Sequence, residues 1–221
     1  MKQKADPRRL PTRNRDILTH LSHQQFAGIG MVALCWNDLD HLLNWVLDAC
    51  LGFDVPMNLE ITSRIHGFDG RLAIIKSFTK NYYDVPQEIA NLFNNTMSLV
   101  GECKSLRDAI VHTRVFNAKD AIGETIEKRG QKTHVLISAE ALMAVALRTV
   151  HAWDELSIVY KYLSASTGND QMGPRHDPEE GMQSHELELL EYVSQLRLRQ
   201  KKRRSLPRLP KFPPLPPVQE D

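Results

Sequence analysis

Residues 85–113 read VPQEIANLFNNTMSLVGECKSLRDAIVHT and carry the clearest helical pattern in the chain. Apolar residues recur there mostly at spacings of three and four, which is the period of one helix face. At the start of the segment, Asp84 precedes Gln87 by three residues with Pro86 between them, an arrangement that resembles a helix cap. We therefore predict an amphipathic helix whose apolar face consists of Ile89, Leu92, Leu99, Cys103, Leu106 and Ile110, with Thr96 in the one gap.

Three further segments have the same period and predict helices over residues 18–51, 58–82 and 139–164. Gly52 is placed to end the first of these helices, and Ser138 is placed to cap the last. The tryptophans all lie on apolar helix faces. We therefore interpret them as core residues rather than as surfaces on which bases stack: Trp36, Trp45 and Trp153.

Two short β-prone runs at residues 125–128 and 133–137 flank residues 129–131, which read Arg-Gly-Gln, and this pattern predicts a hairpin. In the second helical segment, Gly67 and Gly70 each weaken the helix by roughly 1 kcal/mol relative to alanine. The expected fold class is all-α. We predict an up-down bundle of four to five helices with a small β-hairpin excursion, followed by a flexible basic Pro-rich tail.

The composition changes after residue 165. Ser, Gly, Asp, Pro and Glu dominate a stretch with almost no large apolar residues, which predicts a flexible linker. A short helix then leads into a proline-rich end that favours polyproline II structure. The expected organisation is a flexible basic arm at 1–16, a helical bundle at 17–165, a flexible linker at 166–183, a short amphipathic basic helix at 184–204 and a Pro-rich disordered tail at 205–221.

Charge is distributed unevenly along the chain. The 221 residues contain 28 Lys and Arg against 27 Asp and Glu, a net charge of +1. Residues 197–211 hold eight of the basic residues and no acid, which leaves 20 basic and 27 acidic residues elsewhere. The basic tail predicts a salt-sensitive attraction to nucleic-acid phosphates. Its candidate nucleic-acid-binding residues are Arg197, Arg199, Lys201, Lys202, Arg203 and Arg204.

Cysteine content and hydropathy indicate the compartment. Three widely spaced cysteines cannot form a closed disulfide framework, and no apolar run reaches the roughly 18–20 residues of a membrane span. A secretory signal requires an apolar run after its basic N-terminal segment. The basic N-terminus of this chain is not followed by such a run. We expect a cytoplasmic protein that has no membrane segment. We also expect no cofactor and no metal, since His20 and His23 have no evident third ligand.

The segment that points to chemistry lies at the end of the predicted helix 85–113. Asp108 and His112 are four residues apart, so a helix places them on one face within hydrogen-bonding reach. Arg107 borders the apolar stripe, where a guanidinium calls for an anionic partner. Arginine can hold a phosphodiester with two hydrogen bonds, and histidine can move a proton near neutral pH. We therefore predict a phosphate-directed site formed by Arg107, Asp108 and His112.

The residues Arg107-Asp108-x-x-x-His112 resemble the R-polar-x-x-x-H signature of HEPN (higher eukaryotes and prokaryotes nucleotide-binding) domains. The wider context is similar: a long first helix that contains Trp36-Asn37-Asp38-Leu39-Asp40, a bundle of four to five helices, and the motif near the end of the third. The resemblance covers roughly residues 20–165. The family often has Asn where this chain has Asp108, and a small residue where it has Thr113.

The resemblance implies a metal-independent endoribonuclease that acts as a homodimer on RNA, such as a toxin with a cognate antitoxin or a defence nuclease. The resemblance further implies that the RNA 2′-hydroxyl attacks the adjacent phosphate. In that reaction Arg107 would hold the phosphate, His112 would transfer a proton or contact the phosphate, and Asp108 would orient His112. Asp40, on the edge of the first helix stripe, is the supporting acid expected to pair with Arg107.

Two alternatives stay open at this point. Arg107 and Asp40 can form a purely structural ion pair between helices, with Asp108 and His112 as a surface contact. The chain can also be a non-catalytic helical interaction or nucleic-acid-binding module that acts through its basic Pro-rich tail on RNA or on a protein partner.

Overall fold

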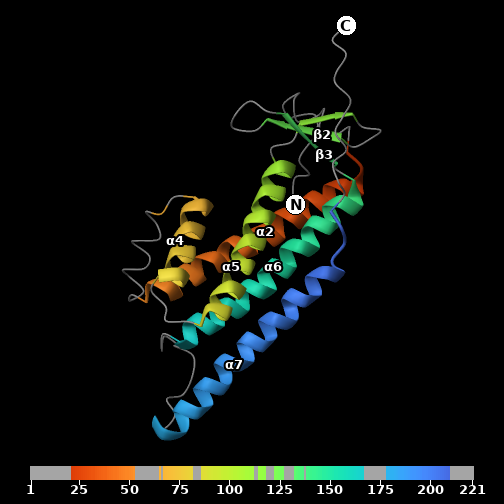
Figure 1. The fold of residues 1–221 in the computed structure, drawn as a ribbon. Helices are drawn as coiled ribbons and strands as arrows, with labels where there is room; N and C mark the ends of the chain where they lie inside the picture. The colour runs from red at the N-terminus through yellow and green to blue at the C-terminus, as the bar shows by residue number, and fades with distance from the viewer. Residues whose placement is uncertain are drawn as a thin grey trace, which may run out of the picture. The chain divides into compact units, whose positions relative to one another are not determined.

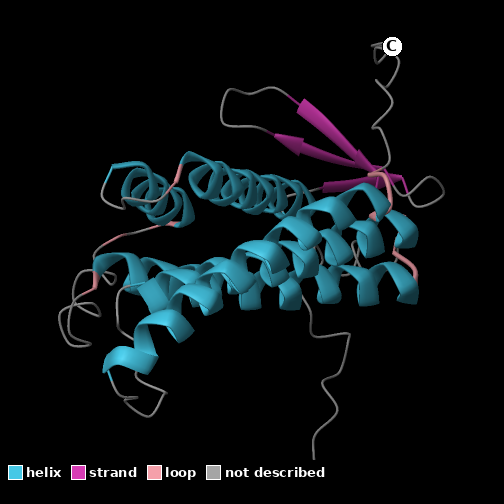
Figure 2. Ribbon diagram, turned by 60° about the horizontal axis from the view of Figure 1, so that its bottom comes forward, coloured by secondary structure: helices cyan, strands magenta, loops and turns pink. Residues whose placement is uncertain are grey.

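The computed structural model describes residues 21–52, 65, 67–81, 86–111, 114–117, 122–126, 132–136, 138–166 and 178–209, and gives only the backbone for residues 79–81, the strands and residues 178–186. The expected arm at 1–16 and the end of the tail lie outside these residues. Helices dominate the described residues (Figures 1 and 2), so the predicted all-α class is confirmed. The elements are α2 (His23–Leu51), α4 (Phe68–Asn81), α5 (Gln87–Val111), α6 (Ala139–Ser166) and α7 (Pro178–Lys202), followed by a 3-10 turn, η2 (Arg203–Ser205).

Three short strands lie between α5 and α6 in the chain: β1 (Arg114–Asn117), β2 (Ile122–Ile126) and β3 (Lys132–Leu136). They pair antiparallel in the order β1-β2-β3, with Ile122 opposite Leu136 and Ile126 opposite Lys132. The register of β1 shifts between Val115 and Asn117. The turn expected at residues 129–131 lies outside the described residues, so the hairpin excursion stays a prediction.

Two helix boundaries lie where the sequence predicted them, and local conformation and hydrogen bonds explain both. Gly52 adopts a φ of +62°, and its N–H donates to the Asp48 carbonyl at 3.1 Å, which ends α2. Ser138 caps α6, because its hydroxyl accepts a hydrogen bond from the Ala141 N–H at 3.1 Å. The Pro86 carbonyl accepts from the Ile89 N–H at 2.8 Å in the first turn of α5. The expected capping residue Asp84 lies outside the described residues.

The start of α2 differs from the prediction. The helix begins at His23 rather than near residue 18. Immediately before it, the Ser22 N–H donates to Gln25 Oε1 at 2.7 Å, and the Gln25 N–H donates to Ser22 Oγ at 3.2 Å. This reciprocal pair is a capping box, which satisfies two backbone donors and so defines the first turn.

The start of α4 is also later than predicted, at Phe68 rather than residue 58. Gly67 has a φ of +92°, in the left-handed region, and this conformation is incompatible with a right-handed helix. Ile65 is likewise not helical, while residues 58–64 and 66 lie outside the described residues. The glycine that we expected to weaken this helix therefore precedes it.

The described residues belong to two compact units. The first comprises Met1–Ala33, Ser105–Ala146 and Pro207–Asp221, and the second comprises Leu34–Lys104 and Leu147–Leu206. In the second unit α5 and α6 run antiparallel, as the Glu102–Arg148 and Thr96–Glu155 contacts require. The core of this unit includes apolar residues from all five helices, among them Leu43, Ile75, Phe93, Leu156 and Leu196.

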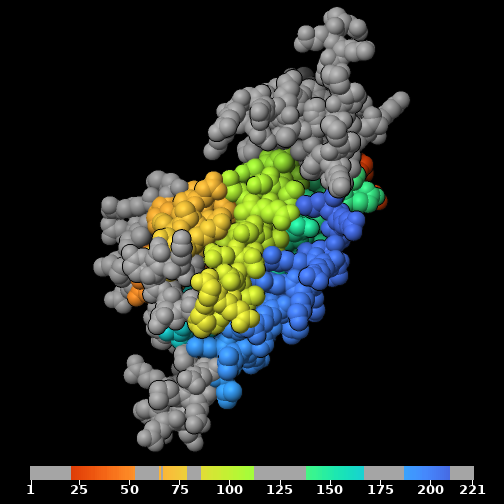
Figure 3. Space-filling model, in the orientation of Figure 1, coloured from red at the N-terminus to blue at the C-terminus, as the bar shows by residue number. Residues whose placement is uncertain are grey.

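The C-terminal helix α7 begins earlier than expected. The chain was expected to form a flexible linker over 166–183 and a separate short helix over 184–204, but α6 continues to Ser166 and α7 already begins at Pro178. In the second unit Val193 and Leu196 are buried, and Figure 3 shows α7 lying along α5. The basic helix is therefore an integral part of this unit. Residues 167–177 lie outside the described residues.

The core interpretation of the tryptophans was wrong for two of the three. Trp45 is 55% exposed and Trp153 is 37% exposed, whereas Trp36 is partly buried and packs on Phe68 with a ring distance of 4.8 Å. Val150 of α6 is exposed as well. Periodicity thus overestimated the apolar face of α6, whereas the face predicted for α5 omitted the buried residues Phe93, Met97 and Val100.

Candidate functional site

Arg107 and Asp108 lie near the end of α5, in the first compact unit. Arg107 Nη1 donates to Asp108 Oδ1 at 2.9 Å, and the two side chains are 31% and 34% exposed. The guanidinium is thus held by an adjacent carboxylate, and both side chains are partly exposed. His112 lies just beyond α5 and outside the described residues. Its expected contact with Asp108 therefore stays a prediction.

Asp40, the expected partner of Arg107, makes a different ion pair in the second unit. Arg71 Nη2 lies 2.6 Å from Asp40 Oδ1, and Arg71 Nη1 donates to Asn44 Oδ1. The Arg71 side chain is largely buried, so this fork joins α4 to α2 within the unit. The sequence pattern did not lead to Arg71 as a site residue. The one indication in the sequence was that this basic residue stands beside Leu72, at the edge of an apolar stripe. Because Asp40 and Arg107 belong to different units, the pairing of these two residues stays a prediction.

Half of the six candidate nucleic-acid-binding cations contact acids of the second unit. Arg197 Nη2 lies 2.6 Å from Glu88, Arg199 Nη1 lies 2.8 Å from Asp154, and Arg203 pairs with Glu155. The other three, Lys201, Lys202 and Arg204, are exposed, and the described residues offer them no ion pair. The cations therefore lie on α7 and η2, in the region where the sequence predicted a short basic helix.

The contact between Arg203 and Glu155 is the centre of a buried polar cluster. Glu155 is completely buried. Arg203 Nε donates to Glu155 Oε1 at 2.5 Å, and Arg203 Nη2 donates to Oε2. Thr96 Oγ1 donates to the same Oε2 at 3.0 Å, and His151 Nε2 lies 3.0 Å from Oε1. Three side chains, one each from α5, α6 and η2, thus meet around the Glu155 carboxylate.

This cluster was not predicted from the sequence, although one of its residues stood out there. Thr96 fills the single gap in the apolar stripe of α5, and its hydroxyl donates a hydrogen bond to the buried Glu155 carboxylate. A buried threonine at such a gap indicates a polar partner. It cannot indicate which residue that partner is.

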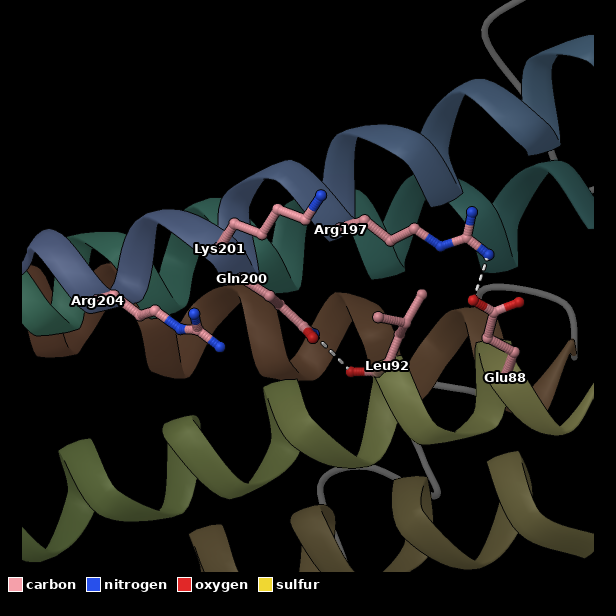
Figure 4. A pocket seen from close by; sticks show the side chains of 6 residues that line it. All are labelled: Glu88, Leu92, Arg197, Gln200, Lys201 and Arg204. Carbon is pink, nitrogen blue, oxygen red and sulfur yellow. Dashed lines mark hydrogen bonds and ion pairs between the residues drawn. The ribbon is translucent and has the colours of Figure 1, made fainter.

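A shallow hollow of about 310 Å³ lies beside this cluster, between α7 and α5 (Figure 4). Gln200 reaches across it, and its Nε2 donates to the Leu92 carbonyl at 2.8 Å and to Thr96 Oγ1 at 3.3 Å. Three cations border the hollow, Arg197 and Lys201 from α7 and Arg204 from η2, and Glu88 is the one acid among the lining residues. The lining residues are Glu88, Leu92, Arg197, Gln200, Lys201 and Arg204.

Other kinds of chemistry have less support in the described residues. Burial raises the pKa of Cys50 and of Cys103 to about 12, so both thiols stay protonated at neutral pH. The described part of the chain contains no group of three or more His, Cys, Asp or Glu side chains placed to hold a metal ion. None of its helices combines the length and the apolarity that a membrane span needs.

Comparison with protein-family models, with curated proteins and with solved structures gave no match. The resemblance to HEPN domains therefore rests on Arg107-Asp108-x-x-x-His112 and on the helical setting of that motif.

Proposed function

We propose that this chain is a HEPN-like, metal-independent endoribonuclease whose site contains Arg107, Asp108 and His112. The observation that supports this proposal is the Arg107–Asp108 hydrogen bond at the end of α5, two residues of the motif held together on a partly exposed helix end. An oriented guanidinium offers parallel N–H donors that match the oxygens of a phosphodiester. The helical setting is the one that the motif resemblance implies.

In the proposed reaction the RNA 2′-oxygen forms a bond to the adjacent phosphorus, and the bond from phosphorus to the 5′-oxygen breaks. The proton leaves the 2′-hydroxyl and a proton reaches the departing 5′-oxygen, which gives a cyclic phosphate and a 5′-hydroxyl. His112 transfers a proton in this step, and Arg107 stabilises the charge that develops on the phosphate. Motifs from two chains would form one cleft in a homodimer.

The proposal predicts cleavage of RNA by the purified protein in EDTA, with cyclic phosphate at the new 3′ ends. His112→Ala should remove this cleavage, because the proton transfer is lost. Fragments can be resolved on denaturing gels, and the cyclic ends can be identified by mass spectrometry. RNA that stays intact at high protein concentration would contradict the proposal. Equal cleavage by His112→Ala would trace the activity to a contaminating nuclease.

In the cell, the proposal places the nuclease in the cytoplasm, as a toxin with a cognate antitoxin or as a defence enzyme. Its expression would then arrest growth, and His112→Ala would relieve the arrest. The histidine substitution separates this function from a scaffold role, since a scaffold does not need His112 for proton transfer.

A second candidate is a non-catalytic module that binds the phosphate backbone of RNA through α7. The observation that favours it is the row of Arg197, Lys201 and Arg204 along the hollow in Figure 4. Residues at i, i+4 and i+7 share one side of a helix, so one strand can meet all three cations. The attraction to phosphate is independent of base sequence and weakens as salt rises.

The triple variant Arg197→Ala, Lys201→Ala, Arg204→Ala should weaken binding of a labelled single-stranded RNA. The slope of log affinity against log salt should fall by about 2, since each phosphate contact to a single strand contributes about 0.7. Fluorescence anisotropy at several salt concentrations measures both quantities. Lys161→Ala, which removes an exposed lysine of α6 outside the row, is the control and should leave both quantities unchanged. An unchanged slope in the triple variant would exclude this candidate.

A further inference from the structure

The cation row on α7 has a defined geometry only while the end of that helix stays docked. Arg197 and Lys201 lie about 6 Å apart along the axis of α7, and Arg204 follows in the 3-10 turn η2. The docked helix holds them beside α5, whereas a detached basic segment would present the same charges in many arrangements. Binding by the docked row therefore needs less ordering of the protein when RNA arrives.

Besides the apolar packing of Val193 and Leu196 in the core, two kinds of polar contact hold this end of α7, and they differ in strength. Arg197 and Glu88 form an exposed ion pair, with side chains 45% and 69% accessible, and such pairs contribute little in water. Glu155, in contrast, is fully buried and accepts hydrogen bonds from Arg203 on η2 and Thr96 on α5. Arg203 also donates to the Asn95 carbonyl at 3.2 Å. The buried cluster is thus the stronger anchor.

The anchor and the cation row alternate along the same stretch of chain. Gln200 and Arg203 point to α5 and α6, and they lie between or beside Arg197, Lys201 and Arg204 in sequence. Fixing Gln200 and Arg203 consequently fixes the direction in which the three cations project. Glu155 itself is buried and contacts Arg203 rather than the hollow, so it can influence a bound strand only through the position of α7.

We propose that Glu155 is a positioning residue for an RNA phosphate-binding row formed by Arg197, Lys201 and Arg204. The inference rests on the second candidate function, in which these cations hold an RNA backbone. In this proposal the buried Glu155 orders the three cations through its contact with Arg203. Removing the negative charge of Glu155 should therefore weaken the binding of RNA, although RNA is a polyanion.

Glu155→Gln separates this proposal from simple charge attraction. The substitution removes one negative charge from the second unit, so charge alone would leave RNA affinity unchanged or raise it. If the anchor orders the row, affinity should instead fall by about fivefold, and the salt slope should fall by about 0.7 as one phosphate contact is lost. A loss of folded protein lowers the active fraction without changing that slope.

The measurement uses the full chain and a labelled single-stranded RNA, with circular dichroism to verify folding and hydrogen exchange to follow residues 187–205. Faster exchange in α7 together with weaker binding and a lower slope supports the proposal. Unchanged exchange, or binding as tight as that of the parent protein, overturns it. Tighter binding would show that Glu155 acts only by its charge.

Thr96→Val provides a second variant should Glu155→Gln fail to fold. It removes a hydroxyl that contacts both Glu155 and Gln200, changes no charge, and keeps the side-chain shape. The expected fall in affinity is about twofold, and affinity equal to the parent's overturns the proposal. If the triple cation variant binds RNA as the parent does, the second candidate function fails. If only that variant loses binding, the role of Glu155 alone fails.

Discussion

Arg203→Leu is expected to lower the free energy of unfolding by about 3–5 kcal/mol, the cost of leaving a buried charge without its partner. Glu155 is inaccessible to water, and Arg203 supplies both of its charge-assisted hydrogen bonds. His151 and Thr96 stay within reach but provide weaker compensation. Denaturant titration followed by circular dichroism measures the change, provided that unfolding is a single transition.

The chain offers a matched control for this substitution. Arg199 also pairs with an acid of α6, but the pair with Asp154 is partly exposed, with side chains 43% and 27% accessible. Arg199→Leu should therefore cost about 0–1 kcal/mol. The double variant Glu155→Leu, Arg203→Leu should recover much of the loss, since apolar residues can replace a buried pair. Equal effects of the two arginine substitutions would show that burial of Glu155 does not govern the stability.

Arg107→Ala is expected to lower RNA cleavage by about 100–1000-fold, the typical cost of removing one group that stabilises transition-state charge. Arg107→Lys should recover little of the activity, because an ammonium group cannot offer two parallel N–H donors to the phosphate. Single-turnover cleavage in EDTA measures the rate without a contribution from product release. Arg148→Ala is a suitable control, because Arg148 also pairs with an acid, Glu102, at 2.7 Å.

Asp108→Asn tests what the second motif residue does. Asparagine keeps an oxygen that can accept the hydrogen bond from Arg107, which the carboxylate accepts at 2.9 Å, or one from His112 that orients the imidazole. It also removes a negative charge beside the proposed phosphate position. We therefore expect cleavage at least as fast as that of the parent protein. Loss of cleavage in Asp108→Asn would mean that the carboxylate itself takes part in the chemistry.

The sequence predicted the helices well because their signals are local. The apolar stripe of α5, the positive-φ glycine that ends α2 and the hydroxyl cap of α6 all act within a few residues of chain. The position of Arg107 and Asp108 at a helix end followed from the same periodicity. The hydrogen bond between Arg107 and Asp108 did not follow from it, because the i, i+4 rule predicts a contact of Asp108 with His112 instead.

By itself, the sequence determined the all-α class, the apolar direction of each helix and the concentration of cations between residues 197 and 211. Only the tertiary structure decided that Arg203 forms hydrogen bonds with Glu155, 48 residues away, and that Arg71 forms one with Asp40, 31 residues away. Periodicity reports which side of a helix is buried, whereas an ion pair depends on which helices become neighbours. For this reason the sequence predicted a basic helix at 184–204, and only the fold shows that its basic end contacts α5 and α6.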